Sequence, residues 1–145
     1  MTDLRIIWDA TNGRGDLNML GPVMEVGHDL ETAVLVSLFT DARAPADYMP
    51  TDGTTDRRGW WGDTYNADDI GSLIWTFARA KKTQDTLNNV QDAARKALQW
   101  LIDDGVAATI DIAAAWVSKT GLGLGITIHK PGELPSQFSF VWDDL

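Results

Sequence analysis

Near the N-terminus the apolar residues recur at every second position, which is the period of a β-strand. Leu4, Ile6 and Trp8 follow this pattern, and an Asn-Gly-Arg-Gly sequence at residues 12–15 turns the chain towards a second extended segment near residues 17–19. The pattern predicts an N-terminal β-hairpin.

A nearly continuous apolar segment covers residues 30–39. Within it, Ala33, Val34 and Leu38 share one face of a helix, and the preceding Asp29 is a residue type favoured at helix N-caps. We therefore expect a helix that is capped by Asp29. An unbroken apolar segment also suits a buried strand, which is the alternative here.

Two more helices are predicted in the middle of the chain. Asp68 and Asp69 precede an apolar stripe with i, i+3, i+4, i+7 spacing over residues 70–77, and carboxylates are favourable at a helix N-terminus. A longer amphipathic pattern over residues 87–101 ends at Gly105, a residue type typical of helix C-termini. We therefore expect about three helices in all.

After residue 106 the period changes back to two. The alternation covers residues 106–118, resumes over residues 122–128 after a Lys-Thr-Gly turn, and recurs in Phe138, Phe140 and Trp142. These segments predict three antiparallel strands. The expected fold class is α+β, with an N-terminal hairpin, about three helices and a C-terminal antiparallel sheet.

The outer strands of such a sheet should leave unpaired backbone groups along at least one edge. A partner protein can add a strand to such an edge by β-augmentation. Alternatively, the chain's own N-terminal hairpin covers the edge. The sequence leaves both alternatives open.

A long segment at about residues 40–67 lacks periodicity and is rich in Asp, Gly and Pro. Pro45 and Pro50 are spaced so that no helix is expected there. Loops of this length in compact domains are usually either functional or disordered. We expect this loop to be ordered, because Trp60 and Trp61 near its end can pin it.

The end of this loop carries the sequence Arg-Arg-Gly-Trp-Trp-Gly-Asp. Neighbouring side chains in an extended loop point in different directions, so one tryptophan is expected in the interior and the other at the surface. One interpretation is an aromatic plug that closes the core. The other is a partner-binding anchor, because Trp and Arg are enriched at interface hot spots. The candidate partner-binding residues are Arg57, Arg58, Trp60, Trp61 and Asp63.

Composition narrows the class of protein. The length of 145 residues fits a single domain over residues 1–145. A net charge of -9 repels phosphates and anionic lipids, and no apolar segment is long enough to cross a bilayer, so we expect neither nucleic acid nor a membrane as partner. The chain has no cysteine, and its two histidines lack metal-ligand spacing. We expect no metal, no cofactor and no catalytic residue.

Several segments together resemble a known family. They are residues 30–44, the stretch from Asp56 to Asp63, Gly-Ser-Leu-Ile-Trp at residues 71–75, and Ala-Leu-Gln-Trp-Leu at residues 97–101. Over about residues 4–128 the chain resembles the forty-sixth-gene-product family of Mu-like phages, a tail baseplate component. The layout is also similar to that of the lysozyme-like baseplate wedge proteins of contractile phages. The Glu-Pro-Arg that follows a helical tryptophan in those proteins is absent after Trp100.

The resemblance implies a non-enzymatic, structural subunit of the wedge of a contractile-tail baseplate. It also implies contacts with other baseplate and tail proteins, assembly in the host cytoplasm, and a final place in the baseplate of the virion tail. The alternative is a glycan-cleaving or glycan-binding tail protein. In that case Asp56 and Asp63, which flank Trp60 and Trp61, would act as carboxylates beside aromatic platforms for sugars.

Overall fold

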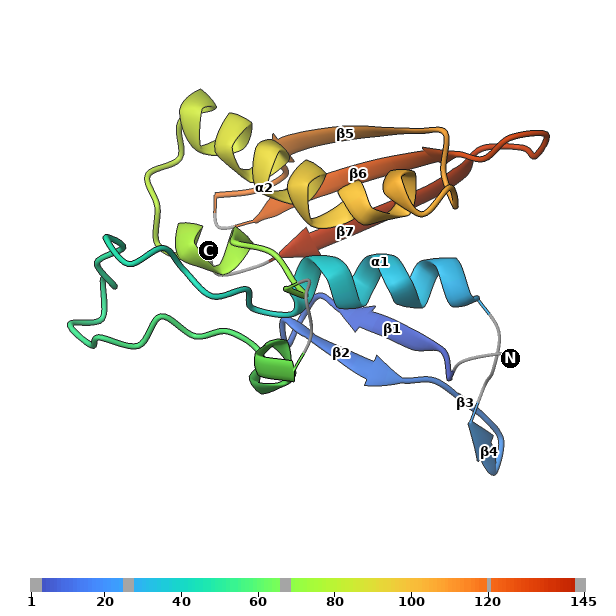
Figure 1. Ribbon diagram of the computed structural model, residues 1–145, viewed down its shortest axis with the longest axis horizontal. Helices are drawn as coiled ribbons and strands as arrows, with labels where there is room; N and C mark the ends of the chain where they lie inside the picture. The colour runs from blue at the N-terminus through green and yellow to red at the C-terminus, as the bar shows by residue number, and fades with distance from the viewer. Residues whose placement is uncertain (1–3, 25–27, 66–68, 120, 143–145) are drawn as a thin grey trace.

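The computed structural model describes residues 4–24, 28–65, 69–119 and 121–142. Its centre is an antiparallel sheet in the order β5-β6-β7, with β5 at Thr109–Trp116, β6 at Leu122–His129 and β7 at Ser136–Trp142. Helices α1 (Asp29–Phe39) and α2 (Gln84–Asp103) pack on one face of this sheet (Figure 1). The α+β class and the C-terminal antiparallel sheet are thus confirmed.

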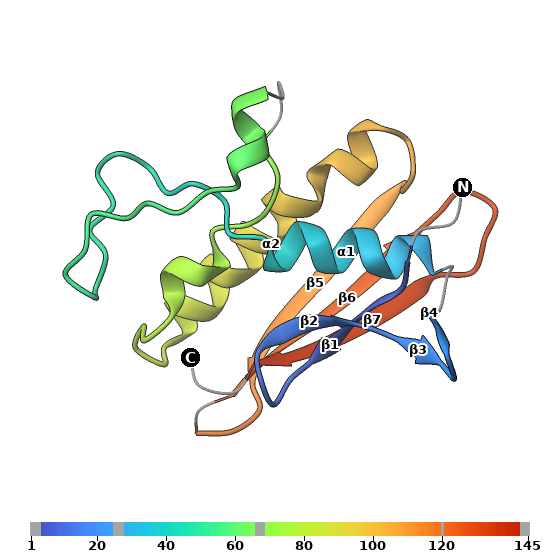
Figure 2. The same cartoon turned by 90° about the horizontal axis from the view of Figure 1, so that it is seen from below.

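The N-terminal hairpin is also confirmed. It pairs β1 (Ile6–Asp9) with β2 (Arg14–Leu17) and lies against α1 on the side away from α2 (Figures 1 and 2). A second, smaller hairpin follows at once and pairs β3 (Met19–Leu20) with β4 (Val23–Met24).

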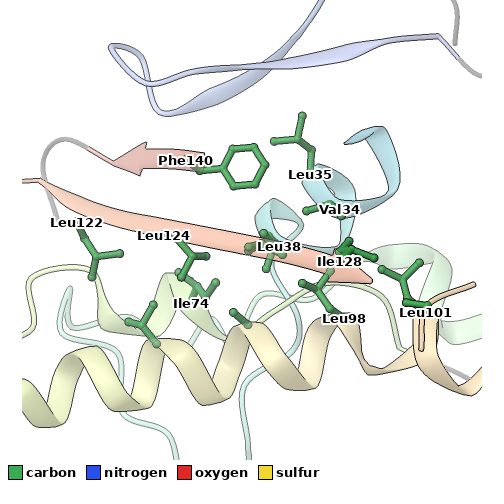
Figure 3. Packing of buried hydrophobic residues seen from close by; sticks show 14 of the residues in the cluster. Val34, Leu35, Leu38, Ile74, Leu98, Leu101, Leu122, Leu124, Ile128 and Phe140 are labelled. Atoms are coloured by element: carbon green, nitrogen blue, oxygen red, sulfur yellow. The ribbon is translucent and has the colours of Figure 1, made fainter. Parts of the chain in front are cut away.

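The hydrophobic core lies between β6 and the two helices, where the labelled side chains point towards one another (Figure 3). Val34 of α1 and Leu98 of α2 are completely buried there. Removing a buried aliphatic side chain of this size from water contributes about 1.5–3 kcal/mol. Alternation along β6 supplies the facing layer, whose members are at most 1% exposed: Leu122, Leu124, Ile126 and Ile128.

Trp8 connects the N-terminal hairpin to the sheet. Its ring stacks on Phe39 of α1 with 3.7 Å between centroids, and it meets Trp142 edge to face at 6.2 Å. Its indole Nε1 donates to the backbone carbonyl of Val141 at 2.9 Å. The hairpin therefore covers one carbonyl group of the outer strand β7.

The predicted helix at residues 30–39 is confirmed as α1, against the alternative of a strand. The prediction that Asp29 caps it is wrong, because Asp29 is the first helical residue and His28 occupies the N-cap with φ 60°. For α2, the Thr83 hydroxyl accepts from the Thr86 N–H at the N-terminus, and Gly105 follows the C-cap with φ +74°, as its predicted role requires.

The prediction of an α-helix over residues 70–77 is wrong, so the described residues form two α-helices rather than about three. The structure has only a short 3₁₀ helix there, η2 (Ile74–Phe77). Asp68, which was expected at the helix start, lies outside the described residues.

The reason is that the backbone before η2 is hydrogen-bonded to another segment. Ser72 N–H donates to the Thr40 carbonyl at 2.9 Å, and the Ser72 carbonyl accepts from Ala42 N–H at 3.0 Å. Gly71 has φ +103°, and a Cβ at this position would lie 2.3 Å from the Thr40 carbonyl oxygen. These hydrogen bonds to residues 40 and 42 and this backbone angle are incompatible with an α-helix.

Candidate functional site

The loop predicted at residues 40–67 extends from the body of the domain in both views, and the structure describes it as far as residue 65 (Figures 1 and 2). Arg57 connects the second half of the loop to the first half. The Arg57 carbonyl accepts from Ala44 N–H at 2.9 Å, and the Arg57 Nε donates back to the Ala44 carbonyl at 2.8 Å. Ala44 is completely buried, so this paired contact closes the base of the loop.

Arg58 makes the second connection. It has φ 52°, and its backbone N–H donates to Asp56 Oδ1 at 2.8 Å. Its Nη1 donates to Asp41 Oδ2 at 2.8 Å, and its guanidinium carbon lies 4.5 Å from the centroid of the Trp75 ring. An exposed ion pair contributes about 0.2–1 kcal/mol and an exposed cation–π contact about 0.5–1 kcal/mol. Arg58 thus holds the loop to the segment before it.

Both tryptophans of the motif lie at the surface. Trp60 is 38% exposed and Trp61 is 75% exposed, and neither belongs to the hydrophobic core. The expectation that one of them enters the interior is therefore wrong, and so is the interpretation as a core plug. A 3₁₀ helix, η1 (Trp61–Tyr65), begins at the second tryptophan, so the backbone is not extended there.

The two rings instead form an aromatic pair outside the core. Their centroids are 5.4 Å apart, with 45° between the ring planes. The Trp60 ring covers Gly62 so closely that a Cβ there would lie 2.1 Å from it. Only glycine permits this approach, so the absence of a side chain at Gly62 makes room for the Trp60 ring.

Asp63 closes the end of the loop. Its N–H donates to the Trp60 carbonyl at 3.1 Å, and its Oδ1 accepts from the N–H of Ile70 at 3.0 Å. Its Oδ2 is buried without a hydrogen-bond partner among the described residues. Asp56 likewise uses a carboxylate oxygen to accept from a backbone N–H, that of Arg58. In this structure both carboxylates organise the loop backbone.

The structure also shows a groove that sequence reasoning missed. It has a volume of about 890 Å³ and lies between α1 and α2, with Trp60 on one part of its wall and Trp100 on another. Trp100 is 41% exposed. The signal was in the sequence, because Trp100 lies outside the apolar stripe of α2 that enters the core.

The described residues contain neither a metal-binding cluster nor a membrane-spanning helix. No group of three or more His, Asp or Glu side chains is placed to hold a metal ion. No helix in the same residues combines the length and apolarity that crossing a bilayer requires.

The fold and the loop define a small α+β domain that presents a braced aromatic pair at its surface. The sequence then assigns the family: residues 30–134 match the model described as phage protein GP46, and the chain belongs to this family. It is 46% identical to the baseplate protein gp46 of Escherichia phage Mu over 148 aligned residues, which cover the full length of both chains. It is 37% identical to the Mu-like prophage FluMu protein gp46 of Haemophilus influenzae, over 97% of this chain and 96% of the relative. The family predicted from the sequence is confirmed.

Proposed function

We propose that the chain is a non-enzymatic structural subunit of the wedge of a contractile phage tail baseplate. The observation that carries this proposal is the exposed Trp60/Trp61 pair on a loop fixed by internal contacts of Arg57 and Arg58. The relative from phage Mu, which aligns over its whole length, is named a baseplate protein. The subunit assembles with other baseplate and tail proteins in the host cytoplasm and then resides in the virion tail baseplate.

The partner contact centres on the Trp60/Trp61 pair. A tryptophan that becomes buried at the centre of an interface typically contributes 2 kcal/mol or more by alanine truncation, to order of magnitude. The loop is already held by Ala44, Asp41 and Trp75, so docking orders few additional groups, and the entropic cost of binding falls. Within this proposal the two arginines position the aromatic anchors.

A second contact uses the edge of the sheet. In the described part of the chain no strand pairs with the outer side of β5 or of β7, but the Trp8 side chain covers one carbonyl of β7. We place β-augmentation by a partner strand at this edge of β5, where backbone N–H and C=O groups would continue the sheet.

Proline substitutions in β5 test the edge contact. Neighbouring N–H groups of a strand point to opposite sides, so Ala113→Pro and Ala114→Pro each remove one donor, one towards β6 and one towards the outer edge. We expect one variant to lose stability, and the other to stay folded but fail to enter baseplates. If the folded variant assembles normally, the edge is not used.

The central proposal is tested by co-expression with the other tail genes of the same phage or prophage. We expect the chain to co-purify with baseplate subunits and to leave purified peptidoglycan unchanged. Peptidoglycan turnover that is lost in Asp56→Asn or Asp63→Asn would instead establish the glycan-cleaving alternative. Binding without turnover, together with absence from tails, would establish a glycan-binding module.

A further inference from the structure

The groove between α1 and α2 is large enough to receive part of another protein. Its volume of about 890 Å³ lies near the upper end of the range of about 300–1,000 Å³ typical of binding clefts. Trp60 contributes to its wall, so the groove adjoins the aromatic pair of the candidate site. The residues described by the structure leave this volume open to solvent.

Helix α2 carries a second stripe, which faces the groove. The stripe that enters the core runs over residues 87–101, and the second is offset from it around the helix. The second stripe has the i, i+3, i+4, i+7 spacing of a single helical face and consists of Ala93, Lys96, Ala97 and Trp100. Its two alanines leave room for the side chains of a partner.

Trp100 is held in place before any partner arrives. Its Nε1 donates to Ser37 Oγ of α1 at 2.9 Å, and that hydroxyl donates to the Ala33 carbonyl at 2.8 Å. The ring is nevertheless 41% exposed. A large aromatic side chain that is oriented in advance and still accessible is typical of an interface anchor.

The charges around the groove specify the partner. Asp69, Asp103 and Asp104 line it, against Arg43 and Lys96. None of the three carboxylates is ion-paired with a basic side chain in the described part of the chain, and the last turn of α2 has no basic residue. A helix C-terminus carries negative partial charge, so acidic residues there are unfavourable for the helix itself. This end of the groove is therefore complementary to positive charge.

We propose that the groove binds a cationic amphipathic segment of another baseplate subunit. Its apolar residues would lie between Trp60 and Trp100, and its Arg or Lys side chains would lie beside Asp103 and Asp104. This inference rests on the proposed baseplate function and names the chemistry of the partner at the same surface.

The test uses the full chain co-expressed with the other baseplate subunits. In Asp103→Lys/Asp104→Lys the new charges suit the C-terminus of α2, so thermal stability should stay equal or rise. Incorporation into the complex should nevertheless fall by about tenfold, and wild-type incorporation should fall as salt is raised. The matched control Asp16→Lys/Glu133→Lys changes the net charge equally on exposed residues outside the groove, and it should assemble normally. Equal incorporation of groove and control variants would overturn the proposal.

A photocrosslinking amino acid at Lys96 identifies the occupant. We expect crosslinks, mapped by mass spectrometry within the purified complex, to a segment with apolar residues next to Arg or Lys. Crosslinks to an acidic segment, or no crosslinks in a complex that forms normally, would refute the groove proposal but not the proposed baseplate function. Failure of the wild-type chain to enter any complex would refute the baseplate function itself. Assembly that is unaffected in the groove variant, with loss of peptidoglycan binding, would show a glycan occupant and contradict the inference.

Discussion

The guanidinium of Arg58 lies 4.5 Å from the centroid of the Trp75 ring while its Nη1 donates to Asp41 at 2.8 Å. Arg58 thereby connects two parts of the chain. One is the loop that carries Trp60 and Trp61, and the other is the segment that follows α1. The position of the aromatic pair therefore depends on a residue whose own contacts are internal to the domain.

Arg58→Ala should release the loop without unfolding the domain. We expect a loss of about 0.7–2 kcal/mol in the free energy of unfolding, because the variant loses both the ion pair and the cation–π contact, which are partly exposed. Amide hydrogen exchange within residues 51–63 should become faster. Arg79→Ala is the matched control, since Arg79 is exposed and also has positive φ, at 65°. Unchanged exchange in Arg58→Ala would mean that this side chain does not brace the loop.

Gly71→Ala should destabilise the domain by about 3 kcal/mol or more, because a Cβ would lie 2.3 Å from the Thr40 carbonyl oxygen at φ +103°. Gly132→Ala separates backbone strain from the clash, since Gly132 has φ +73° but no atom within 4 Å of the added Cβ. We expect about 1 kcal/mol for this control. Denaturant unfolding measures both values, and equal losses would contradict the proposed close contact between residues 71 and 40.

The first hairpin should show a local pH response at Asp9. Hydrogen bonds from the side chain and backbone of Asn12, and from Thr11 N–H, lower the pKa of Asp9 from 3.8. Because the folded pKa is the lower one, the stabilising contribution is present above the unfolded pKa and is lost as pH falls through the folded pKa.

Asn12→Ala should therefore raise the pKa of Asp9 towards 3.8, as measured by NMR titration of the carboxyl carbon. Asp52 serves as an internal control, because hydrogen bonds from Thr54 lower its pKa independently of Asn12. An Asp9 pKa that does not change in the variant would show that the Asn12 bonds do not form in solution.

The sequence predicted correctly those elements in which the spacing of apolar residues follows the buried face of the element. Alternation over residues 106–142 identified the sheet, since one face of each strand packs on the helices. The apolar stripe at residues 70–77 was misleading, because Ser72 pairs with Thr40 and Ala42, and such a contact leaves no periodic signal. Residue spacing predicts local structure well but does not record a distant backbone partner.

For the candidate site, the sequence located the loop but not its geometry. The motif identified residues 57–63 as the candidate site. In the structure, however, the two arginines bind other residues of the same domain, and both tryptophans lie outside the core. The groove depends on how α1 and α2 pack, and within it the Trp100 ring is hydrogen-bonded to Ser37 of the other helix. The pattern of α2 places Trp100 outside the core stripe, but a single sequence does not show which residues of another helix it will meet.

The most direct measurement is the amount of Trp61→Ala protein in purified tails, relative to wild type, by quantitative mass spectrometry. Trp61 is 75% exposed, so its truncation should change the free energy of unfolding by about 0.5 kcal/mol or less, while its abundance in tails should fall about tenfold or more. Leu134→Ala, another exposed apolar truncation at 89% exposure, should be incorporated normally. If the folded Trp61→Ala and Trp60→Ala proteins are each as abundant in tails as the wild-type protein, the claim that this pair anchors the subunit in the baseplate is contradicted.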